Sequence, residues 1–169
     1  MINPLKATSI ITLQFYHQDH YASLKNFYLT PAQLKFTALP HDVLEIAIKD
    51  SYRHPVVIEV EGKPVGFFVL HHGSEIQEYT TNPKAILLRA FSINFNEQRK
   101  GYASKALEAL PSFVRDNFNN FDEIVLAVNK QNDQAIKLYE KANFLYRGKK
   151  RYGLFGMQYI LHYSFEIKE

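Results

Sequence analysis

The sequence contains no cysteine, no tryptophan and only seven glycines among its 169 residues. Without cysteine there can be no disulfide bond, no thiolate ligand for a metal and no cysteine nucleophile. No apolar run approaches the roughly 20 residues that cross a bilayer as a helix. The charge is close to balanced, because twenty Lys and Arg stand against seventeen Asp and Glu. This balance gives no case for broad binding to nucleic acid or to a membrane.

The composition that remains is that of a folded domain. Hydrophobic residues make up 46% and charged residues 22% of the chain, and no repeat or linker divides it, so we expect one domain over residues 1–169. Residues 1–6 lack the basic stretch leading into a long apolar one that a signal peptide needs, and we therefore expect a cytoplasmic protein. Thirteen Phe and eleven Tyr predict a core rich in aromatic rings.

Apolar periodicity predicts five elements in the first half of the chain. They are strands at 8–16, 55–60 and 65–70, and helices at 19–28 and 42–49. The last two strands should form a hairpin, because Glu61, Gly62 and Lys63 between them are typical of a tight turn. A polar connection follows the hairpin.

The second half of the chain is patterned more clearly. It predicts strands at 84–94, 123–128, 145–150 and 157–165, and helices at 103–118 and 133–142. Strand 84–94 is apolar almost throughout except for Arg89, which is typical of an inner strand covered on both faces. Pro111 lies inside a helix, where we expect a kink or a break. The order of elements predicts an α/β (α+β) fold, with a mixed, mostly antiparallel sheet of six to seven strands and helices on both faces.

The segment 91–103 carries the clearest chemical signal. A buried strand ends, a polar loop follows, and a helix begins at Gly101-Tyr102-Ala103. The first N–H groups of a helix have no partner within the helix, and the helix dipole adds positive potential there. Small residues let a ligand approach the backbone closely, and Arg99, Lys100 and Lys105 add charge nearby. The segment therefore predicts an anion site suited to a pyrophosphate.

An alternative interpretation is a strand-to-helix turn without a ligand, in which Gly101 is needed only for its backbone angle. A Walker A loop is excluded, because no Gly-Lys-Ser/Thr occurs. A dinucleotide fingerprint is a poor match, since it needs three glycines and this loop has one.

Two motifs in order favour a coenzyme. Residues 98–103, Gln-Arg-Lys-Gly-Tyr-Ala, resemble the pyrophosphate loop of the GNAT superfamily of N-acetyltransferases. Residues 132–144, from Asn132 through Ala135, Leu138 and Tyr139 to Phe144, resemble the same family's second conserved helix. The family usually has glycine where this chain has Asn143, and Asn is the next-best residue for a left-handed turn at a helix end.

The resemblance implies an acetyl-CoA site built from a strand edge, the loop and the second helix. The implied cofactor-binding residues are Phe91, Ser92, Ile93, Gln98, Arg99, Lys100, Gly101, Tyr102, Ala103, Ser104, Asn132 and Lys141. In the family, the strand that includes Phe91 and Ile93 separates from its neighbour, and the pantetheine arm pairs with the exposed edge like an added strand. Asn132 is also expected to cap its helix.

Tyr139 is the catalytic candidate, because the resemblance places its hydroxyl beside the coenzyme sulfur. A phenol with a pKa of about 10 can protonate a thiolate whose acid has a pKa of about 8.5 only if the transfer is concerted or the phenol's pKa is lowered. Spacing alone offers a core role instead, because Ala135, Leu138, Tyr139 and Ala142 form one helical stripe.

The general base is not evident. Some family members carry a Glu where this chain has Leu87, so a water chain or another side chain must accept the amine's proton. Glu59, Glu75 and Glu78 lie near predicted strand ends, where a solvated carboxylate is the ordinary interpretation.

Histidines and a basic cluster invite other functions, which we consider less favoured. The side chains of the adjacent His71 and His72 point to opposite faces of a strand, and His17 and His20 lack a metal motif, so we expect no metal site. The basic residues 147–151 are expected in a solvated hairpin turn rather than on RNA.

The sequence therefore predicts transfer of acetyl from acetyl-CoA to a primary amine of a small molecule. A polyamine such as spermidine is suggested by a loose likeness of 33–36 and 42–49 to bacterial polyamine acetyltransferases, with Asp42, Glu45, Glu59 and Glu78 as candidate partners for its charge. A protein N-terminus and an aminoglycoside stay open as acceptors, and a homodimer stays open as the assembly. The rival from another class is a coenzyme-binding sensor or adaptor without turnover.

Overall fold

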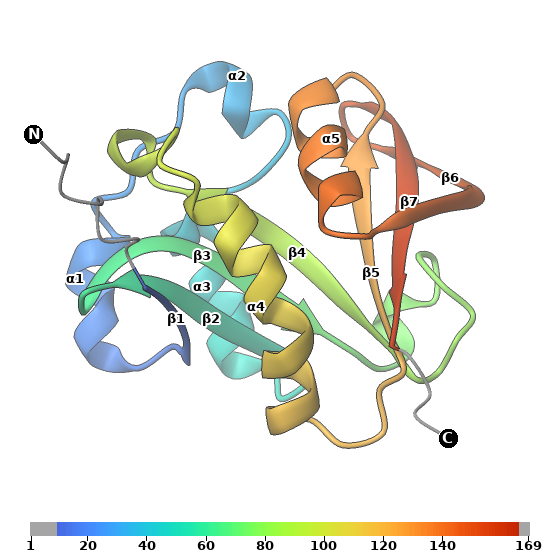
Figure 1. Cartoon of the computed structure of the whole chain (residues 1–169), viewed down its shortest axis with the longest axis horizontal. Coiled ribbons are helices and arrows are strands. Elements are labelled where there is room, and N and C mark those ends of the chain that lie inside the picture. Colours follow the sequence, from blue (N-terminus) through green and yellow to red (C-terminus); the bar gives the residue numbers. More distant parts are fainter. Residues whose placement is uncertain (1–9, 166–169) are drawn as a thin grey trace, which may run out of the picture.

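The computed structural model describes residues 10–165 and shows one seven-stranded sheet with helices on both of its faces (Figure 1). The strand order is β1-β2-β3-β4-β5-β7-β6, and every neighbouring pair is antiparallel except β4 and β5. The strands are β1 (Ile11–Phe15), β2 (Arg53–Val60), β3 (Lys63–His71), β4 (Ala85–Ile93), β5 (Glu123–Asn129), β6 (Leu145–Gly153) and β7 (Gly156–Ser164). The predicted fold class is confirmed, and the start of the predicted strand 8–16 lies outside the described residues.

The helices divide between the two faces of the sheet. They are α1 (Tyr21–Leu24), α2 (Pro31–Leu34), α3 (Pro40–Lys49), α4 (Tyr102–Asn117) and α5 (Asp133–Lys141), with short 3-10 turns at Gln18–His20, Ser74–Ile76 and Phe95–Glu97. Helices α4 and α5 pack on one face and α1 and α3 on the other. None of the helices in the described part of the chain is long and apolar enough to cross a membrane.

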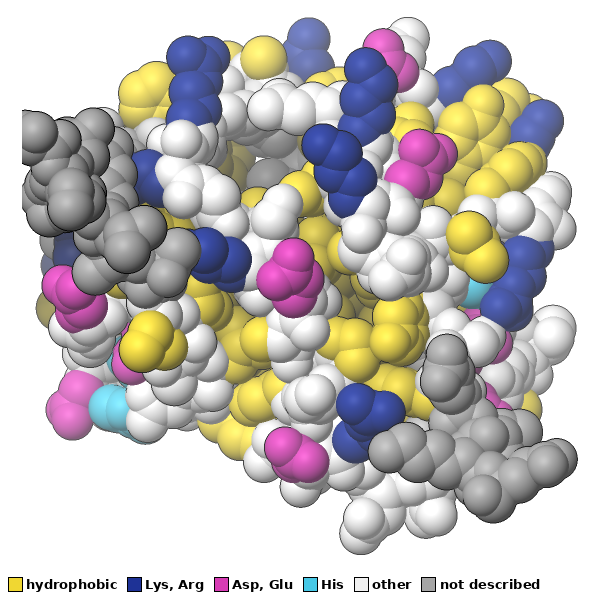
Figure 2. Space-filling view, in the orientation of Figure 1, with side chains coloured by type: hydrophobic (Ala, Val, Ile, Leu, Met, Phe, Trp, Pro, Cys, Tyr) yellow, Lys and Arg dark blue, Asp and Glu magenta, His cyan; other side chains and the backbone are white. Residues whose placement is uncertain are grey.

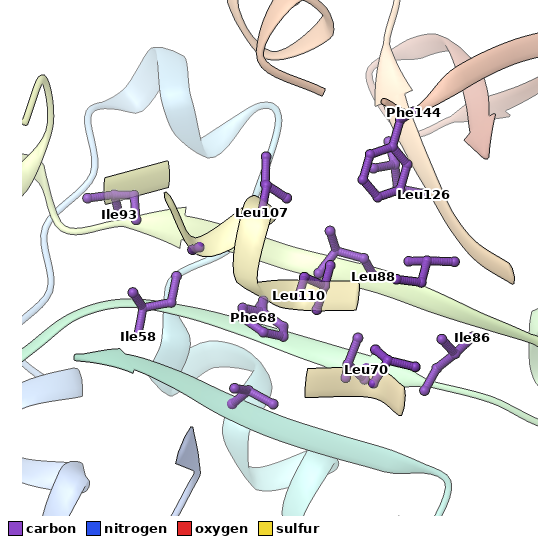
Figure 3. Packing of buried hydrophobic residues seen from close by; sticks show 14 of the residues in the cluster. Ile58, Phe68, Leu70, Ile86, Leu88, Ile93, Leu107, Leu110, Leu126 and Phe144 are labelled. Atoms are coloured by element: carbon purple, nitrogen blue, oxygen red, sulfur yellow. The ribbon is translucent and has the colours of Figure 1, made fainter. Parts of the chain in front are cut away.

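The main core lies between α4, α5 and the sheet. Leu107 and Leu110 of α4 point at Phe68 and Leu88 of the inner strands (Figure 3). These four side chains are at most 3% exposed, and burying each one fully contributes about 1.5–3 kcal/mol of transfer free energy. The apolar character of β4 on both faces, apart from Arg89, is confirmed and follows from its cover on both sides.

Of the kink or break expected at Pro111, the break does not occur. The helix runs from Tyr102 to Asn117 with Pro111 inside it. The missing proline N–H removes one backbone hydrogen bond. Leu110, Pro111 and Val114 are all buried, and their packing offsets the loss of this one hydrogen bond.

The basic cluster lies in a strand and not at the hairpin turn, contrary to the sequence expectation. Residues 147–151 are part of β6, and the turn falls at Leu154 and Phe155, between Gly153 and Gly156. Gly148 has a φ of 95° at a register shift between β6 and β7. This irregularity takes up the left-handed Gly148, so β6 continues through a basic, glycine-containing segment that the sequence suggested was a turn.

Helix α2 was not predicted, although its sequence signal is present. Thr30 accepts a hydrogen bond from the Gln33 backbone, and the Gln33 side chain bonds back to the Thr30 backbone N–H. This reciprocal pair is a capping box, and Pro31 at the first helical position supports it. The result is a one-turn helix that places Gln33 near the candidate site.

Candidate active site

Strands β4 and β5 separate after a short parallel contact. They pair only at Ala85 with Glu123, Ile86 with Ile124 and Leu87 with Val125. Beyond Leu87 the register with β5 ends while β4 continues to Ile93. The strands thus diverge in the middle of the sheet, and the later half of β4 offers a backbone edge toward the gap.

A β-bulge bends β4 at the start of this open edge. The register with β3 shifts between Phe67, which faces Ser92, and Val69, which faces Arg89. Ala90 in the bulge has a φ of 54°, a left-handed conformation that costs an L-residue about 1–2 kcal/mol. Non-glycine residues held in this region are concentrated at functional sites, where the fold over-determines them.

Backbone groups of Phe91 and Ile93 point into the gap. The Asn94 N–H donates to Val65 of β3 at 2.9 Å, and alternate residues of an antiparallel strand turn their polar groups to opposite sides. On the gap side, the Thr37 hydroxyl donates to the Phe91 carbonyl at 3.0 Å and the Gln98 amide to the Ile93 carbonyl at 2.9 Å. The predicted edge is therefore present, with two side chains holding its carbonyls.

The loop after β4 delivers an uncapped helix end. Gly101 is the N-cap of α4 with a φ of 82°, and no side chain caps this end. Arg99 also adopts a positive φ, 63°. A Cβ at Gly101 would meet nothing within 4 Å, so the side-chain side of this residue is open. The first N–H groups of the helix lack intrahelical partners and attract an anion.

Glu97 holds two lysines near this loop in place through hydrogen bonds. This buried carboxylate accepts from Lys63 at 2.7 Å and from Lys100 at 3.0 Å. The hydrogen bonds from Lys63 and then Lys100 hold the pKa of Glu97 below its usual range. Lys100 is thus tied to the loop itself. Figure 2 shows a hollow between α2 and the N-terminal end of α4, with Lys and Arg side chains along the upper edge of this face.

Tyr139 of α5 reaches the open edge from the other side of the gap. Its ring contacts Phe91 edge-on at 6.3 Å between centroids and Phe144 at 5.9 Å. Ala135, Leu138 and Tyr139 pack on the main core as the stripe predicted. Burial raises the pKa of the Tyr139 hydroxyl, so the group stays protonated at neutral pH. The lowered pKa that full proton donation requires is not provided, and the hydroxyl can donate a hydrogen bond instead.

The remaining candidate residues lie at different distances from the edge. The Asn132 side chain caps α5 by accepting from the Ala135 N–H at 3.3 Å, as predicted. Ser92 pairs with β3, and its buried hydroxyl has no hydrogen-bond partner among the described residues. Lys141 is exposed in the last turn of α5. Asn143 adopts a φ of 71° directly after that helix, which confirms its expected left-handed conformation.

Gln33 and Thr37 are functional candidates that the sequence analysis missed in this role. Gln33 donates to the Gln98 side chain at 2.9 Å, and Gln98 in turn holds the Ile93 carbonyl. The partners are 65 and 54 residues apart in the chain. No local pattern reports contacts across such separations.

The carboxylates considered at the sequence level do not converge. Leu87 is buried at the position where a base was sought. Four acids have separate close partners, with Asp42 at His41, Glu45 at Lys49, Glu59 at His20 and Glu78 at Arg151. Asp42 and Glu45 lie on α3, Glu59 lies on β2 and Glu78 follows the 3-10 turn Ser74–Ile76, and each acid contacts its own basic residue, so the four do not form one pocket for a cation.

One group of metal-ligand type is present in the described residues. Asp50, His71 and Glu75 place ligand atoms within 4.8 Å of one another. Arg53 donates to Asp50 at 3.1 Å and lies 3.5 Å from Glu75, and Arg89 approaches His71 Nδ1 at 3.2 Å. The Arg53 guanidinium contacts both carboxylates, so the two acids already have a cationic partner in this cluster.

The fold and the open edge together define an acyl-CoA N-acyltransferase domain, and comparison with known proteins agrees. Residues 16–144 match the Acetyltransferase (GNAT) family. The chain is 45% identical over 157 residues to a protein from Bacillus subtilis (strain 168) named uncharacterized N-acetyltransferase YbbJ, covering 92% of this chain and 98% of that one. The protein therefore belongs to the GNAT family of acetyltransferases.

More distant relatives have named substrates. The chain is 28% identical to a spermine/spermidine N(1)-acetyltransferase of the same B. subtilis strain, over 82% of this chain and 90% of the relative. Among solved structures, an aminoglycoside acetyltransferase AAC(6')-Ib bound to coenzyme A superimposes with a TM-score of 0.74 at 19% identity, covering 92% and 95% of the two chains. A spermidine N-acetyltransferase from Vibrio cholerae, bound to CoA and spermine, gives 0.69 at 17% identity, covering 91% and 95%. At these identities the structural likeness establishes the fold.

Proposed function

We propose that this acetyltransferase moves the acetyl group of acetyl-CoA to a primary amine of a small molecule. The observation that carries the proposal is the continuous backbone surface formed by the open β4 edge and the uncapped N-terminus of α4. A diphosphate suits the helix end, and an extended amide-containing arm suits a strand edge. Coenzyme A has both parts in that order.

The proposed reaction uses the edge and Tyr139 at opposite sides of the thioester. The amine nitrogen attacks the thioester carbonyl, the C–N bond forms, the C–S bond breaks, and the amine's proton is lost. An edge N–H at Phe91 can stabilise the developing oxyanion, and one well-placed donor of this kind contributes about 2.7–4 kcal/mol. The Tyr139 hydroxyl donates a hydrogen bond to the sulfur that leaves.

Proton removal from the amine is assigned to water in this proposal. Leu87 is buried and apolar, and Glu59 and Glu78 hold His20 and Arg151. An amine with a pKa near 10.4 is mostly protonated at neutral pH. The rate should therefore rise with pH as the free amine becomes more abundant.

A polyamine is one candidate acceptor. The named substrates of the 28% identical relatives support it. The carboxylates expected to bind its charges are not assembled in this chain, so the support comes from the relatives and not from the site. An aminoglycoside or a protein N-terminus fits the same chemistry.

The proposal is tested by measuring thiol release from acetyl-CoA with a panel of primary amines, with the acetylated product identified by mass spectrometry. We expect release above the amine-free rate with at least one small amine, together with an acetylated product. Tight coenzyme binding without product for any amine would instead support the sensor or adaptor. Product formed only on peptides would move the acceptor to a protein N-terminus.

A further inference from the structure

Arg89 is a charged residue in an inner strand, and the chemistry proposed above gives it no role. It lies on β4 directly before the bulge residue Ala90, two residues after the last contact between β4 and β5 at Leu87. Its side chain is half-buried. Burial, the largest influence, lowers the pKa of the Arg89 guanidinium, yet an arginine remains protonated at neutral pH.

Arg89 projects from the face of the sheet that lies opposite α4 and α5. It stands across from Val69 of β3, which packs with α1 and α3, and residues directly opposite in an antiparallel pair share a face. Phe91, by contrast, stacks on Phe68 and contacts Tyr139 on the α4 and α5 side. Because the function proposed above puts coenzyme A along the Phe91 side, we place the approach of the amine on the opposite face, where Arg89 projects.

The neighbours of Arg89 do not neutralise it. Its Nη1 contacts His71 Nδ1 at 3.2 Å. His71 is 1% exposed, and burial followed by the charges of Arg53 and Arg89 lowers the pKa of His71 to about 4. The imidazole is therefore neutral at pH 7 and offers a lone pair without a charge.

The nearby carboxylates contact other arginines, and Glu75 also lies 3.3 Å from His71 Nε2. Arg53 lies 3.1 Å from Asp50 and 3.5 Å from Glu75. Another arginine, Arg151 of β6, contacts Glu78 at 2.9 Å and lies over the Tyr79 ring at 4.6 Å. Within residues 10–165, no carboxylate forms an ion pair with Arg89 within 4 Å, and Glu78 acts on the guanidinium only from a greater distance. A half-buried cation without a counter-ion is costly unless a ligand supplies the charge.

We infer that Arg89 binds an acidic group, a carboxylate or a phosphate, carried by the amine that accepts the acetyl group. This inference rests on the proposed function and narrows its substrate class to anionic primary amines. A guanidinium fork matches either acid with two parallel hydrogen bonds. A polyamine has no acidic group and would bring only positive charge beside Arg89, which opposes binding.

The test compares matched acceptors that differ in one charge. A series of amino carboxylates of increasing length is assayed against the corresponding carboxamides, with aminoalkyl phosphates as a second arm and spermidine as a third. For the wild-type protein we expect kcat/KM for at least one acid to exceed that of its uncharged partner by at least about tenfold. Comparing kcat/KM between the amino carboxylates and the aminoalkyl phosphates then identifies the acid as carboxylate or phosphate.

Arg89→Met keeps the aliphatic stem and removes the charge, and it should reduce this ratio to near one. Arg89→Lys should recover part of the ratio, because it restores the charge without the fork. Arg115→Met, an exposed arginine on α4, is the matched control and should leave the ratio unchanged. Thermal unfolding of each variant confirms that the fold is retained.

Failure of this inference and failure of the proposed function give different results. The inference is overturned if acids and amides are acetylated equally well, if Arg89→Met keeps the preference, or if spermidine is the best acceptor. The proposed function then still stands. Calorimetry of acids and amides with CoA-saturated protein covers the case without turnover. If the acids bind in a way that depends on Arg89 but are not acetylated, the proposed function is contradicted and the inference about Arg89 stands. If the acids neither bind nor react, both proposals are contradicted.

Discussion

Tyr139 combines a packing role with the hydrogen-bonding role in catalysis that we propose for it. Its ring packs on the main core against Phe144 and contacts Phe91 of the open β4 edge. The sequence left core and catalytic roles as alternatives, and the stripe of α5 satisfies the first without excluding the second. Burial raises its pKa, which makes it a hydrogen-bond donor and not a free acid.

Tyr139→Phe should lower kcat at least tenfold, about 1.4 kcal/mol, with the KM for acetyl-CoA little changed. The reason is that the phenol acts on the departing sulfur and not on coenzyme binding. Steady-state kinetics with the best acceptor of the panel gives both values. Tyr163→Phe is the matched control, because Tyr163 also packs against Phe144 from the far side of the core.

An unchanged kcat in Tyr139→Phe would reduce this residue to packing. The pH profile gives a second check. A raised pKa keeps the phenol neutral below its unfolded value of about 10, so Tyr139 should cause no loss of rate as pH rises toward 10. A falling limb below pH 10 that disappears in the Phe variant would contradict the burial of this hydroxyl.

At the scale of elements, the site depends on where β4 ends and α4 begins. The strand supplies an edge, and the helix supplies N–H groups without a capping side chain. Gly101 joins them in a left-handed conformation, and the space beside it is open. The proposed anion site needs both the left-handed turn at Gly101 and the open space beside it.

Gly101→Val should weaken binding of acetyl-CoA by at least about tenfold, because the new side chain occupies the open space beside Gly101 and strains the turn. Calorimetric titration of the coenzyme measures the loss. Gly148→Val is the control, since Gly148 also has a positive φ and open space around it but lies in β6. Equal affinity in wild type and Gly101→Val would remove this loop from the coenzyme site.

Most elements could be predicted from sequence because their signals are local. The loop into α4, the stripe of α5 and the left-handed Asn143 each depend on residues close together in the chain. Of the kink or break expected at Pro111, the break does not occur, because the packing of buried neighbours outweighs one lost hydrogen bond. Helix α2 was missed although Thr30 and Gln33 form a capping box that the sequence contains.

The finer parts of the site could not be predicted from sequence in the same way. The bulge at Ala90 is invisible because alanine is not typical of a left-handed residue. Thr37 and Gln33 reach the edge from another part of the chain, so only the fold brings them there. Arg89 was visible as the single charge in an apolar strand, yet its lack of a carboxylate partner is a property of the folded neighbourhood.

For the whole molecule, the proposals place coenzyme and acceptor on opposite faces of the sheet where β4 separates from β5. The face with α4 and α5 offers the helix end, the strand edge and Tyr139, and the opposite face offers Arg89. A sheet that stayed paired beyond Leu87 would close both approaches. An aminoglycoside acetyltransferase and a spermidine acetyltransferase share this fold, so the fold does not select the acceptor, and we assign that selection to side chains such as Arg89.

Amide hydrogen exchange with and without coenzyme A tests the central claim most directly, because the claim concerns main-chain N–H groups. We predict that the coenzyme slows exchange at Phe91, at Ile93 and in the first turn of α4 by at least about tenfold, while Leu13 in β1 is unchanged. Binding that leaves the β4 edge and the α4 terminus exchanging at their original rates, or that protects another surface, would contradict the account.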